Sequence, residues 1–142
     1  MSRIKLQMPE AFSFITQIPV RISDINYGNH VGNDAVLSLI HEARVQYLAH
    51  YGFSELQCAG VGLIMSDAGI EFKKEIFYGD VIKASVTAVN FTSIGFDLYY
   101  KLETNGKAAV LAKTGMICYD YDKKKIASVP EVVKEKLTAI SN

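Results

Sequence analysis

Apolar and polar side chains alternate near the beginning of the chain. The apolar positions recur with the two-residue period of a strand that buries one face, at Phe12, Phe14, Ile18, Val20 and Ile22. This pattern predicts a half-buried strand over Phe12–Ile22. Because Pro19 has no N–H to donate, we expect this strand to lie at a sheet edge or to begin pairing after the proline.

The next apolar residues follow the spacing of a helix, from Asn33 to Tyr51. They form one broad stripe, made of Val36, Leu37, Ile40, Ala43, Tyr47, Leu48 and Tyr51. Leu39 and Val45 carry apolar character onto other faces. Asn33 is a suitable N-cap, and Gly52 is a typical helix stop. We therefore expect a helix about 28 Å long that the rest of the protein largely encloses.

From Val61 onward the sequence predicts strands joined by short turns. The segments are Val61–Met65, residues 70–73, Val81–Phe91, Phe96–Glu103, Ala108–Tyr119 and a short extension at Ile126–Val129. Tyr78-Gly79-Asp80 and Asn105-Gly106 are turn signals, and the second is typical of a tight hairpin. Pro130 is well placed to open a C-terminal helix, Pro130–Ala139.

This order of elements favours one architecture. A long apolar helix between one strand and a run of antiparallel strands is buried economically by a curled sheet wrapped around it. The predicted class is α+β, with five or six antiparallel strands around one long central helix and a short C-terminal helix, in a single domain over residues 1–142. Such a sheet leaves a face or an edge to be covered, so we predict a homodimer or a dimer of dimers.

Composition narrows the possible partners. The chain has 142 residues, 49% of them apolar, and fifteen basic side chains balance fifteen acidic ones. This balance argues against a non-specific binder of nucleic acid or of a membrane surface. Because the sequence shows no leader and no apolar stretch of membrane-spanning length, we expect a cytoplasmic protein. Cys58 and Cys118 lack a metal-ligand spacing, so we expect reduced thiols and no metal.

Polar residues are concentrated between the first strand and the long helix. Residues 21–33 include an arginine, an aspartate, a histidine, three asparagines and two glycines. Such groups at the entrance to a buried helix are costly unless they bond one another or act on a ligand. The start of a helix also offers free N–H groups and a partial positive charge, which suit a developing oxyanion. We therefore place the chemistry here.

Several strings in the chain resemble a known family. They are Val20-Arg21-x-x-Asp24-x-Asn26-x-x-x-His30-Val31-x-Asn33, Glu42-Ala43-Arg44, and Ile70-x-Phe72 followed by Tyr78-Gly79-Asp80. Together they are similar to the hotdog-fold acyl-CoA thioesterases of the 4-hydroxybenzoyl-CoA thioesterase-like group, from about residue 14 to about residue 137. The resemblance implies hydrolysis of an acyl-CoA or acyl-carrier thioester to free acid and thiol. It implies no cofactor apart from the coenzyme A part of the substrate.

The resemblance also assigns roles to the polar loop, with one departure. The family's first aspartate, its histidine and its oxyanion-binding backbone N–H fall on Asp24, His30 and Asn33. Its second aspartate, commonly taken as nucleophile or general base, falls on Asn26. An amide carries no charge and does not accept a proton near neutral pH.

These residues suggest a mechanism for thioester hydrolysis. The N–H of Asn33, with that of Gly32, would hold the oxyanion, while His30 or Asp24 activates water and Asn26 orients it. Asp24 would also fix the tautomer of His30. Structural roles remain open for the same side chains. Asp24 and Asn26 can close turns, His30 can bond the backbone, and Asn33 can cap the helix.

Lysines are candidates for the phosphates of coenzyme A. We favour Lys73 and Lys74, because they precede the turn near the expected cleft, over Lys101, Lys113 and the run Lys123–Lys125. Glu42 and Arg44 on the helix are expected to form ion pairs with the sheet or a partner subunit. The acyl group would lie between helix and sheet, where Tyr47, Tyr51, Phe72 and Met65 either line a tunnel or belong to the core.

Two other functions remain open. A non-catalytic acyl-thioester binding protein is favoured by Asn26 in place of a carboxylate. A hotdog dehydratase would pair His30 with a helix carboxylate such as Glu42 across a dimer, although the loop string resembles the thioesterase branch.

Overall fold

The computed structural model describes residues 2–138 of the chain. Its elements in chain order are β1 (Phe14–Pro19), the short 3-10 turn η1 (Ile22–Asp24), α1 (Asn33–His50), β2 (Gly62–Phe72), β3 (Val81–Val89), β4 (Gly95–Thr104), β5 (Lys107–Asp120), β6 (Lys125–Ile126) and α2 (Glu131–Thr138). The strands form one six-stranded antiparallel sheet in the order β1-β3-β4-β5-β2, with β6 paired to β5. This arrangement confirms the predicted class.

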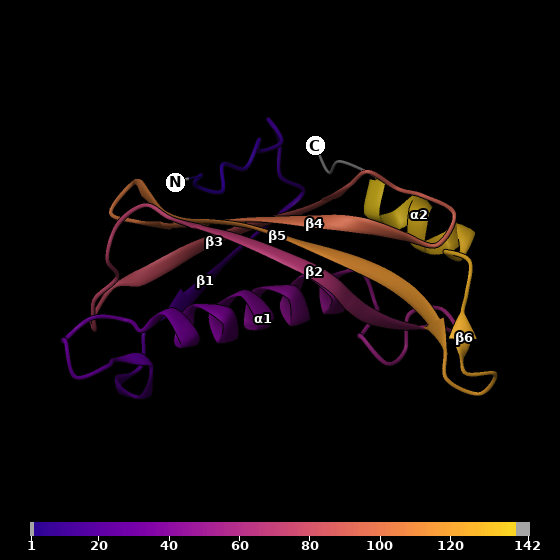
Figure 1. The fold of residues 1–142 in the computed structure, drawn as a ribbon, viewed down its shortest axis with the longest axis horizontal. Helices are drawn as coiled ribbons and strands as arrows, with labels where there is room; N and C mark the ends of the chain where they lie inside the picture. Colours follow the sequence, from indigo (N-terminus) through magenta and orange to yellow (C-terminus); the bar gives the residue numbers. More distant parts are fainter. Residues whose placement is uncertain (1, 139–142) are drawn as a thin grey trace.

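The long helix lies along one face of the sheet, and the segment before β1 lies on the opposite side (Figure 1). The alternation in β4 explains how the sheet meets the helix, since its even-numbered side chains Phe96, Leu98, Tyr100 and Leu102 are all buried. Burying each large apolar side chain contributes roughly 1.5–3 kcal/mol to the free energy of folding. The core therefore lies between α1 and the sheet.

The helix is enclosed on one face only, which corrects the expectation of a largely buried helix. Its buried residues are Val36, Leu39, Ile40, Ala43, Arg44, Tyr47 and Leu48. Leu37 and Val45 are 48% and 45% exposed. The sheet curves over one side of α1, and the apolar side chains on its other side face outward in a single chain.

The first strand ends earlier than the alternation suggested. β1 stops at Pro19, and Ile22, which continues the alternating pattern, lies in η1 with 71% of its surface exposed. Asp24 closes that turn by accepting a hydrogen bond from the N–H of Arg21 at 2.8 Å. The prediction of an edge strand is confirmed, because β1 pairs with β3 alone.

The cap of the long helix also differs from the prediction. Gly32, not Asn33, precedes the helix in an extended conformation, and no side chain caps it. Asn33 is the first helical residue. The predicted stop is confirmed, because Gly52 adopts a left-handed conformation with φ of 86° directly after the C-cap.

The two short apolar segments after the helix are one strand. β2 runs from Gly62 to Phe72, and a bulge between Met65 and Asp67 shifts its register against β5. The Asn105-Gly106 turn is confirmed, since both residues have positive φ (52° and 78°) between β4 and β5. The predicted strand extension is shorter, at Lys125–Ile126. The predicted end of the C-terminal helix, Ala139, lies outside the described residues.

Gly95 at the start of β4 provides a test of the sheet packing. A Cβ atom added there would overlap the carbonyl oxygen of Met116, a backbone atom that cannot rotate away. Gly95→Ala should therefore lower the free energy of unfolding by about 2 kcal/mol or more. At Gly69 the nearest atom to an added Cβ is the Cδ2 of Leu6, at 3.6 Å, which is ordinary contact. Gly69→Ala is the matched control in urea denaturation, and equal losses in both variants would contradict the packing described here.

Candidate active site at the start of the long helix

The polar loop is held together mainly by its own backbone. The N–H of Asn26 donates to the carbonyl of His30 at 2.9 Å, and Ile25 pairs with Val31 as an isolated bridge. The Oδ1 of Asn26 accepts from the N–H of Gly28 at 2.8 Å, which is an Asx turn. Asn29 supplies the left-handed residue, with φ of 67°. The loop therefore folds back and brings His30 beside position 26.

The structure places Asp24 away from His30. Its carboxylate is buried and faces Arg21, through the backbone N–H at 2.8 Å and the guanidinium Nη2 at 3.4 Å. The tautomer of His30 is held instead by Val31, whose carbonyl lies 3.0 Å from Nδ1. A carbonyl oxygen only accepts, so Nδ1 carries the proton and the lone pair of Nε2 is available. Asp24 therefore stabilises the turn and does not orient the histidine.

One of the two expected oxyanion donors is already used. The N–H of Gly32 donates to the carbonyl of Asp24 at 3.3 Å, so the expectation of a Gly32 contribution is not met. Asn33 is in the first turn of α1, where N–H groups lack helical partners. Among residues 2–138 no acceptor bonds the N–H of Asn33.

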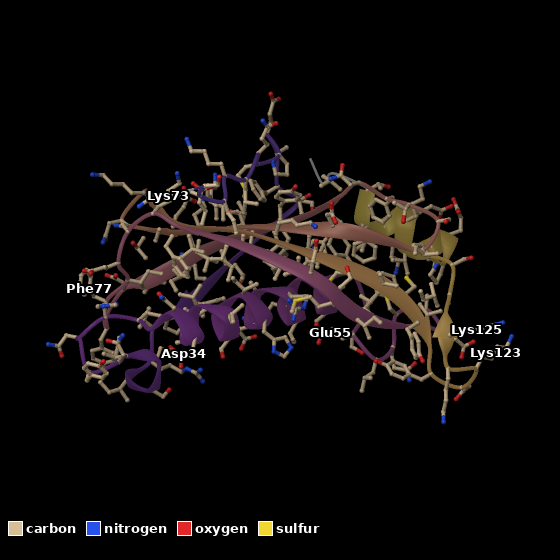
Figure 2. The ribbon with its side chains drawn as sticks, in the orientation of Figure 1. Asp34, Glu55, Lys73, Phe77, Lys123 and Lys125 are labelled. Carbon is tan, nitrogen blue, oxygen red and sulfur yellow. The ribbon has the colours of Figure 1, made fainter. Side chains whose placement is uncertain are left out.

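A second loop lies against the first. The N–H of Val31 donates to the carbonyl of Ile76 at 2.8 Å, which ties the polar loop to the segment between β2 and β3. Figure 2 shows the consequence at the scale of the molecule: Asp34, Phe77 and Lys73 lie at one end, and Lys123 and Lys125 lie at the other.

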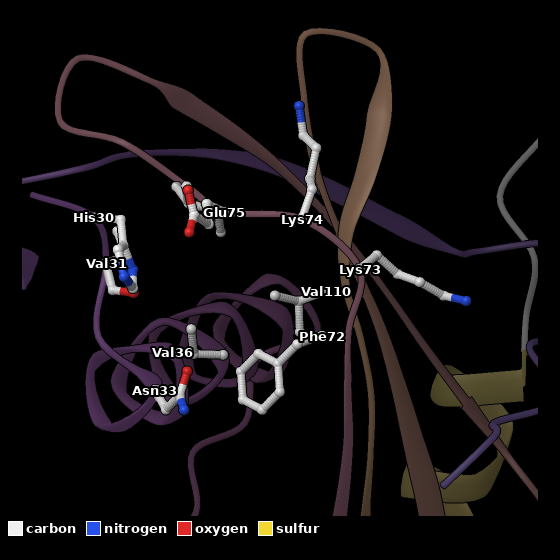
Figure 3. Close-up of a pocket in the computed structure, with 10 residues that line it drawn as sticks. His30, Val31, Asn33, Val36, Phe72, Lys73, Lys74, Glu75 and Val110 are labelled. Atoms are coloured by element: carbon white, nitrogen blue, oxygen red, sulfur yellow. The ribbon is translucent and has the colours of Figure 1, made fainter. Parts of the chain in front are cut away.

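Between these loops a cavity of about 220 Å³ opens beside the start of α1. Its lining residues are His30, Val31, Asn33, Val36, Phe72, Lys73, Lys74, Glu75, Ile76 and Val110 (Figure 3). The cavity brings His30 and Asn33 together against an apolar wall. Asp24 and Asn26 do not line it, and Asn26 contributes through the loop that carries His30.

The side chains of Lys73 and Lys74, the two predicted phosphate-binding lysines, point in different directions. In Figure 3 Lys74 rises from the rim of the cavity, whereas Lys73 points away from it. Lys73 pairs with Glu71 at 2.7 Å. Glu75 also lines the cavity and was missed in the sequence, where it follows two lysines in a charged loop and resembles an ordinary solvated residue. The signal that could have found it is its place just after the strand that ends opposite the helix start.

A second cavity of about 290 Å³ lies further along the helix. It is lined by Leu37, Ser38, Ile40, His41, Arg44, Met65, Ala68, Ile70, Ala112, Lys113 and Thr114. In the register of β2 and β5, Phe72 faces Val110 in the first cavity, and Ile70 faces Ala112 in the second. The two cavities therefore follow one another along a groove between α1 and the β2 edge of the sheet.

Met65 and Phe72 line these cavities as predicted, but Tyr47 and Tyr51 do not. The rings of the two tyrosines pack edge to face, with centroids 5.1 Å apart, near the end of the helix. They belong to the core. Cys58 and Cys118 are also buried, and burial raises their pKa values to about 12 and about 11, so neither is a nucleophile at neutral pH.

Arg44 forms an ion pair as predicted, but its partner, Glu55, lies in the loop after the helix and not on the sheet. Its Nε donates to Glu55, and its Nη1 donates to the hydroxyl of Tyr100 at 3.3 Å. His41 lies 3.2 Å from the other oxygen of Glu55. Burial opposes ionisation of Glu55, but the bonds from Arg44 and His41 outweigh it and lower the pKa of this carboxyl. Glu42 is exposed, and among the described residues it has no ion-pair partner.

Within the described part of the chain, no three His, Cys, Asp or Glu side chains gather in a group that could hold a metal ion. None of the helices formed by residues 2–138 is long and apolar enough to cross a membrane.

Comparison with known proteins agrees with this geometry. Residues 20–137 match the family described as the Thioesterase-like superfamily. The chain is 29% identical over 109 residues to a 1,4-dihydroxy-2-naphthoyl-CoA hydrolase from Microcystis aeruginosa, which covers 75% of this chain and 79% of that protein.

Solved structures share the fold. A thioesterase from Thermus thermophilus, complexed with coenzyme A and Zn, has a TM-score of 0.81 and 20% identity, covering 93% of this chain and 96% of that one. A 1,4-dihydroxy-2-naphthoyl-CoA thioesterase from Synechocystis also has a TM-score of 0.81, at 19% identity, covering 91% and 98%. The six-stranded sheet with its central helix is thus the hotdog fold.

The ion pair of Glu55 predicts a pH dependence of stability. Because its pKa is lowered below the ordinary value of 4.5, its contribution is present above that value and is lost as pH falls through the folded-state pKa. Glu55→Gln should cost about 1–2 kcal/mol of unfolding free energy at neutral pH. The difference from wild type, measured by urea titration, should shrink as the pH is lowered below 4.5 and through the folded-state pKa. The exposed Glu42→Gln is the control, and a Glu55→Gln deficit that persists unchanged in acid would contradict this account.

Proposed function

The chain belongs to the thioesterase-like superfamily, and we propose that it hydrolyses an acyl-CoA thioester to free acid and thiol in the cavity at the start of α1. The observation that supports this site is the N–H of Asn33, which has no acceptor among residues 2–138 and lies beside His30 in one cavity. An acyl group delivered by a carrier protein would present the same thioester.

The hydrolysis needs one donor and one base. The thioester carbonyl oxygen accepts from the N–H of Asn33, where the helix start also favours negative charge. Water gives a proton to Nε2 of His30 while its oxygen attacks the carbonyl carbon. The tetrahedral intermediate then collapses, the C–S bond breaks, and the thiolate leaves and takes the proton that Nε2 of His30 had accepted. A thiolate is a good leaving group, so the site does not depend on a strong general acid.

Two further side chains bear on the choice of base. Asn26 carries no charge, and its Oδ1 already accepts from Gly28, so it acts on water only as a polar neighbour. Glu75 offers a carboxylate that lines the cavity, opposite the loop of His30 (Figure 3). His30 has its proton fixed on Nδ1 by Val31 and is the base in this proposal.

The acyl group would occupy the groove along α1. Its two cavities, about 220 and 290 Å³, suit a compact acyl group of short or medium length or an aromatic one. The 1,4-dihydroxy-2-naphthoyl-CoA hydrolase from Microcystis aeruginosa supports the inclusion of aromatic thioesters. A panel of acyl-CoA substrates, read as free thiol, tests the function directly.

The same panel separates the alternatives. A binding protein without activity would hold acyl-CoA and release no thiol above background. A dehydratase would hydrate an enoyl thioester without hydrolysis and would need a carboxylate such as Glu42 near His30. Within one chain Glu42 is exposed and lies nine residues beyond Asn33 on α1, about two and a half turns away, so this alternative needs the Glu42 of a second copy.

The protein would act as a homo-oligomer in the cytoplasm. The edge strand β2 carries the exposed Met65, which lines the second cavity together with the exposed Leu37 of α1, and this surface supports pairing with a second copy. Cys58 and Cys118 are buried free thiols, which fits a reducing compartment.

Asn26→Asp tests whether position 26 limits turnover. An aspartate keeps the acceptor for the N–H of Gly28 and adds a carboxylate beside the loop of His30. We expect kcat for the best acyl-CoA to rise about tenfold or more, because a general base contributes about 10²–10⁴ in rate. Asn29→Asp adds the same charge in the same loop and serves as the control. Unchanged kcat in Asn26→Asp would show that position 26 does not limit the reaction.

His30→Ala and Glu75→Gln separate the two bases. Removing the imidazole should lower kcat by about 10²-fold, whereas Glu75→Gln should stay within about threefold of wild type. His50→Ala, which removes an exposed imidazole at the far end of α1, controls for the loss of a histidine. The reverse order of effects would assign the base to Glu75.

A further inference from the structure

The N-terminal segment has a defined place in the fold. Residues 2–13, here called the N-terminal arm, precede β1 and lie outside the range 20–137 that matches the family. The arm lies on the side of the sheet opposite α1 (Figure 1). The N–H of Leu6 donates to Oε1 of Glu71 at 2.9 Å. Leu6 and Ile4 lie against β2 at Gly69, where an added Cβ would be 3.6 Å and 3.9 Å from their side chains.

The arm and the end of β2 enclose a broad hollow. It is lined by residues 2–5 of the arm, by residues 70–72 at the end of β2, and by Lys73, which follows the strand. Three of these side chains are cationic, Arg3, Lys5 and Lys73, and one is anionic, Glu71, which gives the hollow a net charge of +2. Its lining is therefore suited to an anion.

The single carboxylate in the hollow is already engaged. Glu71 accepts from Nζ of Lys73 at 2.7 Å and from the backbone of Leu6 at 2.9 Å. Among the residues that the structure describes, no carboxylate lies within ion-pair distance of Arg3 or Lys5. Lys73 and the backbone of Leu6 lower the pKa of Glu71 most, and Lys5 adds a weaker attraction from beyond ion-pair distance. The arm thus presents two cations that have no direct ion-pair partner among the described residues.

This hollow adjoins the cavity of the candidate active site. Phe72 and Lys73 line both. Figure 3 shows Phe72 directed toward Asn33, and Lys73 directed away from that cavity. Because β2 is an edge strand, a ligand can pass around its end from one face of the sheet to the other. A thioester at Asn33 and a phosphate group beside the arm can therefore belong to one molecule.

We propose that the N-terminal arm forms the phosphate subsite for the substrate, with Arg3 and Lys5 joining Lys73 to hold the phosphorylated adenosine of coenzyme A. This inference rests on the proposed hydrolysis of acyl-CoA. Coenzyme A fits because a flexible pantetheine chain separates its thioester from a group with several phosphates. A guanidinium and two ammonium groups are strong partners for phosphate oxygens. Since all three are exposed, the interaction is sensitive to salt.

The test compares two double variants that lose the same charge. Arg3→Ala with Lys5→Ala removes the cations of the arm, and Lys123→Ala with Lys125→Ala removes two cations at the other end of the molecule (Figure 2). Binding of coenzyme A is measured by calorimetry at low and at moderate salt. We expect the arm variant to bind coenzyme A about five- to twentyfold more weakly and to lose much of the salt dependence, with the control within twofold of wild type.

Kinetics provides a second measurement. With acyl-CoA the arm variant should show a raised KM and an unchanged kcat. With an N-acetylcysteamine thioester of the same acyl group, which lacks the nucleotide, its kinetics should match wild type. Equal effects of the two double variants, no effect of either, or no binding of coenzyme A by wild type would overturn the inference.

These outcomes distinguish this inference from the proposed function. Hydrolysis of the N-acetylcysteamine thioester with no effect of the arm variant would leave the thioesterase in place and reject the subsite. Weakened binding of coenzyme A by the arm variant, in a protein that releases no thiol from any thioester, would support the subsite and reject hydrolysis.

Discussion

The unsatisfied N–H groups at the beginning of α1 are the constraint on which the site depends. A helix that starts inside the protein must find acceptors for its first N–H groups or leave them for a ligand. Here the loop before the helix satisfies its own backbone, and it takes up the N–H of Gly32 through Asp24. The N–H of Asn33 has no acceptor among residues 2–138, and Asn33 lines a cavity with an apolar wall. In such a setting a hydrogen bond from this donor stabilises an oxyanion more than it would in water, because little solvent competes for the donor.

The same loop explains why an amide at position 26 is compatible with the fold. The interactions of this position are a turn to Gly28 and a backbone bond to His30, and neither needs a negative charge. The charge that the family usually places here is therefore a chemical feature and not a structural one. Its absence leaves the imidazole of His30, with its tautomer fixed, and the carboxylate of Glu75 as the candidate bases among the described residues that line the cavity. The rate of the enzyme, more than its fold, should reflect this departure.

Much of the fold follows from the sequence because period-two alternation and tight turns act locally. The strands and the Asn105-Gly106 hairpin were predicted, and the boundaries that failed have local causes. Pro19 ends β1, so the alternation that reaches Ile22 continues into a 3-10 turn. A glycine caps α1 through its backbone, where a side-chain cap was expected at Asn33. In the site, His30 and Asn33 were found because they share one loop. Glu75 was not, because a bond between Val31 and Ile76, far apart in sequence, brings it there.

The groove between α1 and β2 has one side exposed to solvent, and the predicted oligomer would cover that side. A sheet edge and an apolar helix face are separately tolerable in a monomer, but β2 and the outer face of α1 border the same groove. An acyl chain in that groove would bury one side against Ile70 and Ala112 and leave the other side in water. A second copy paired along β2 would cover the exposed Met65 and Leu37 and exclude water from the acyl chain at the same time. Substrate binding and association would then draw on the same apolar surface, so each would strengthen the other.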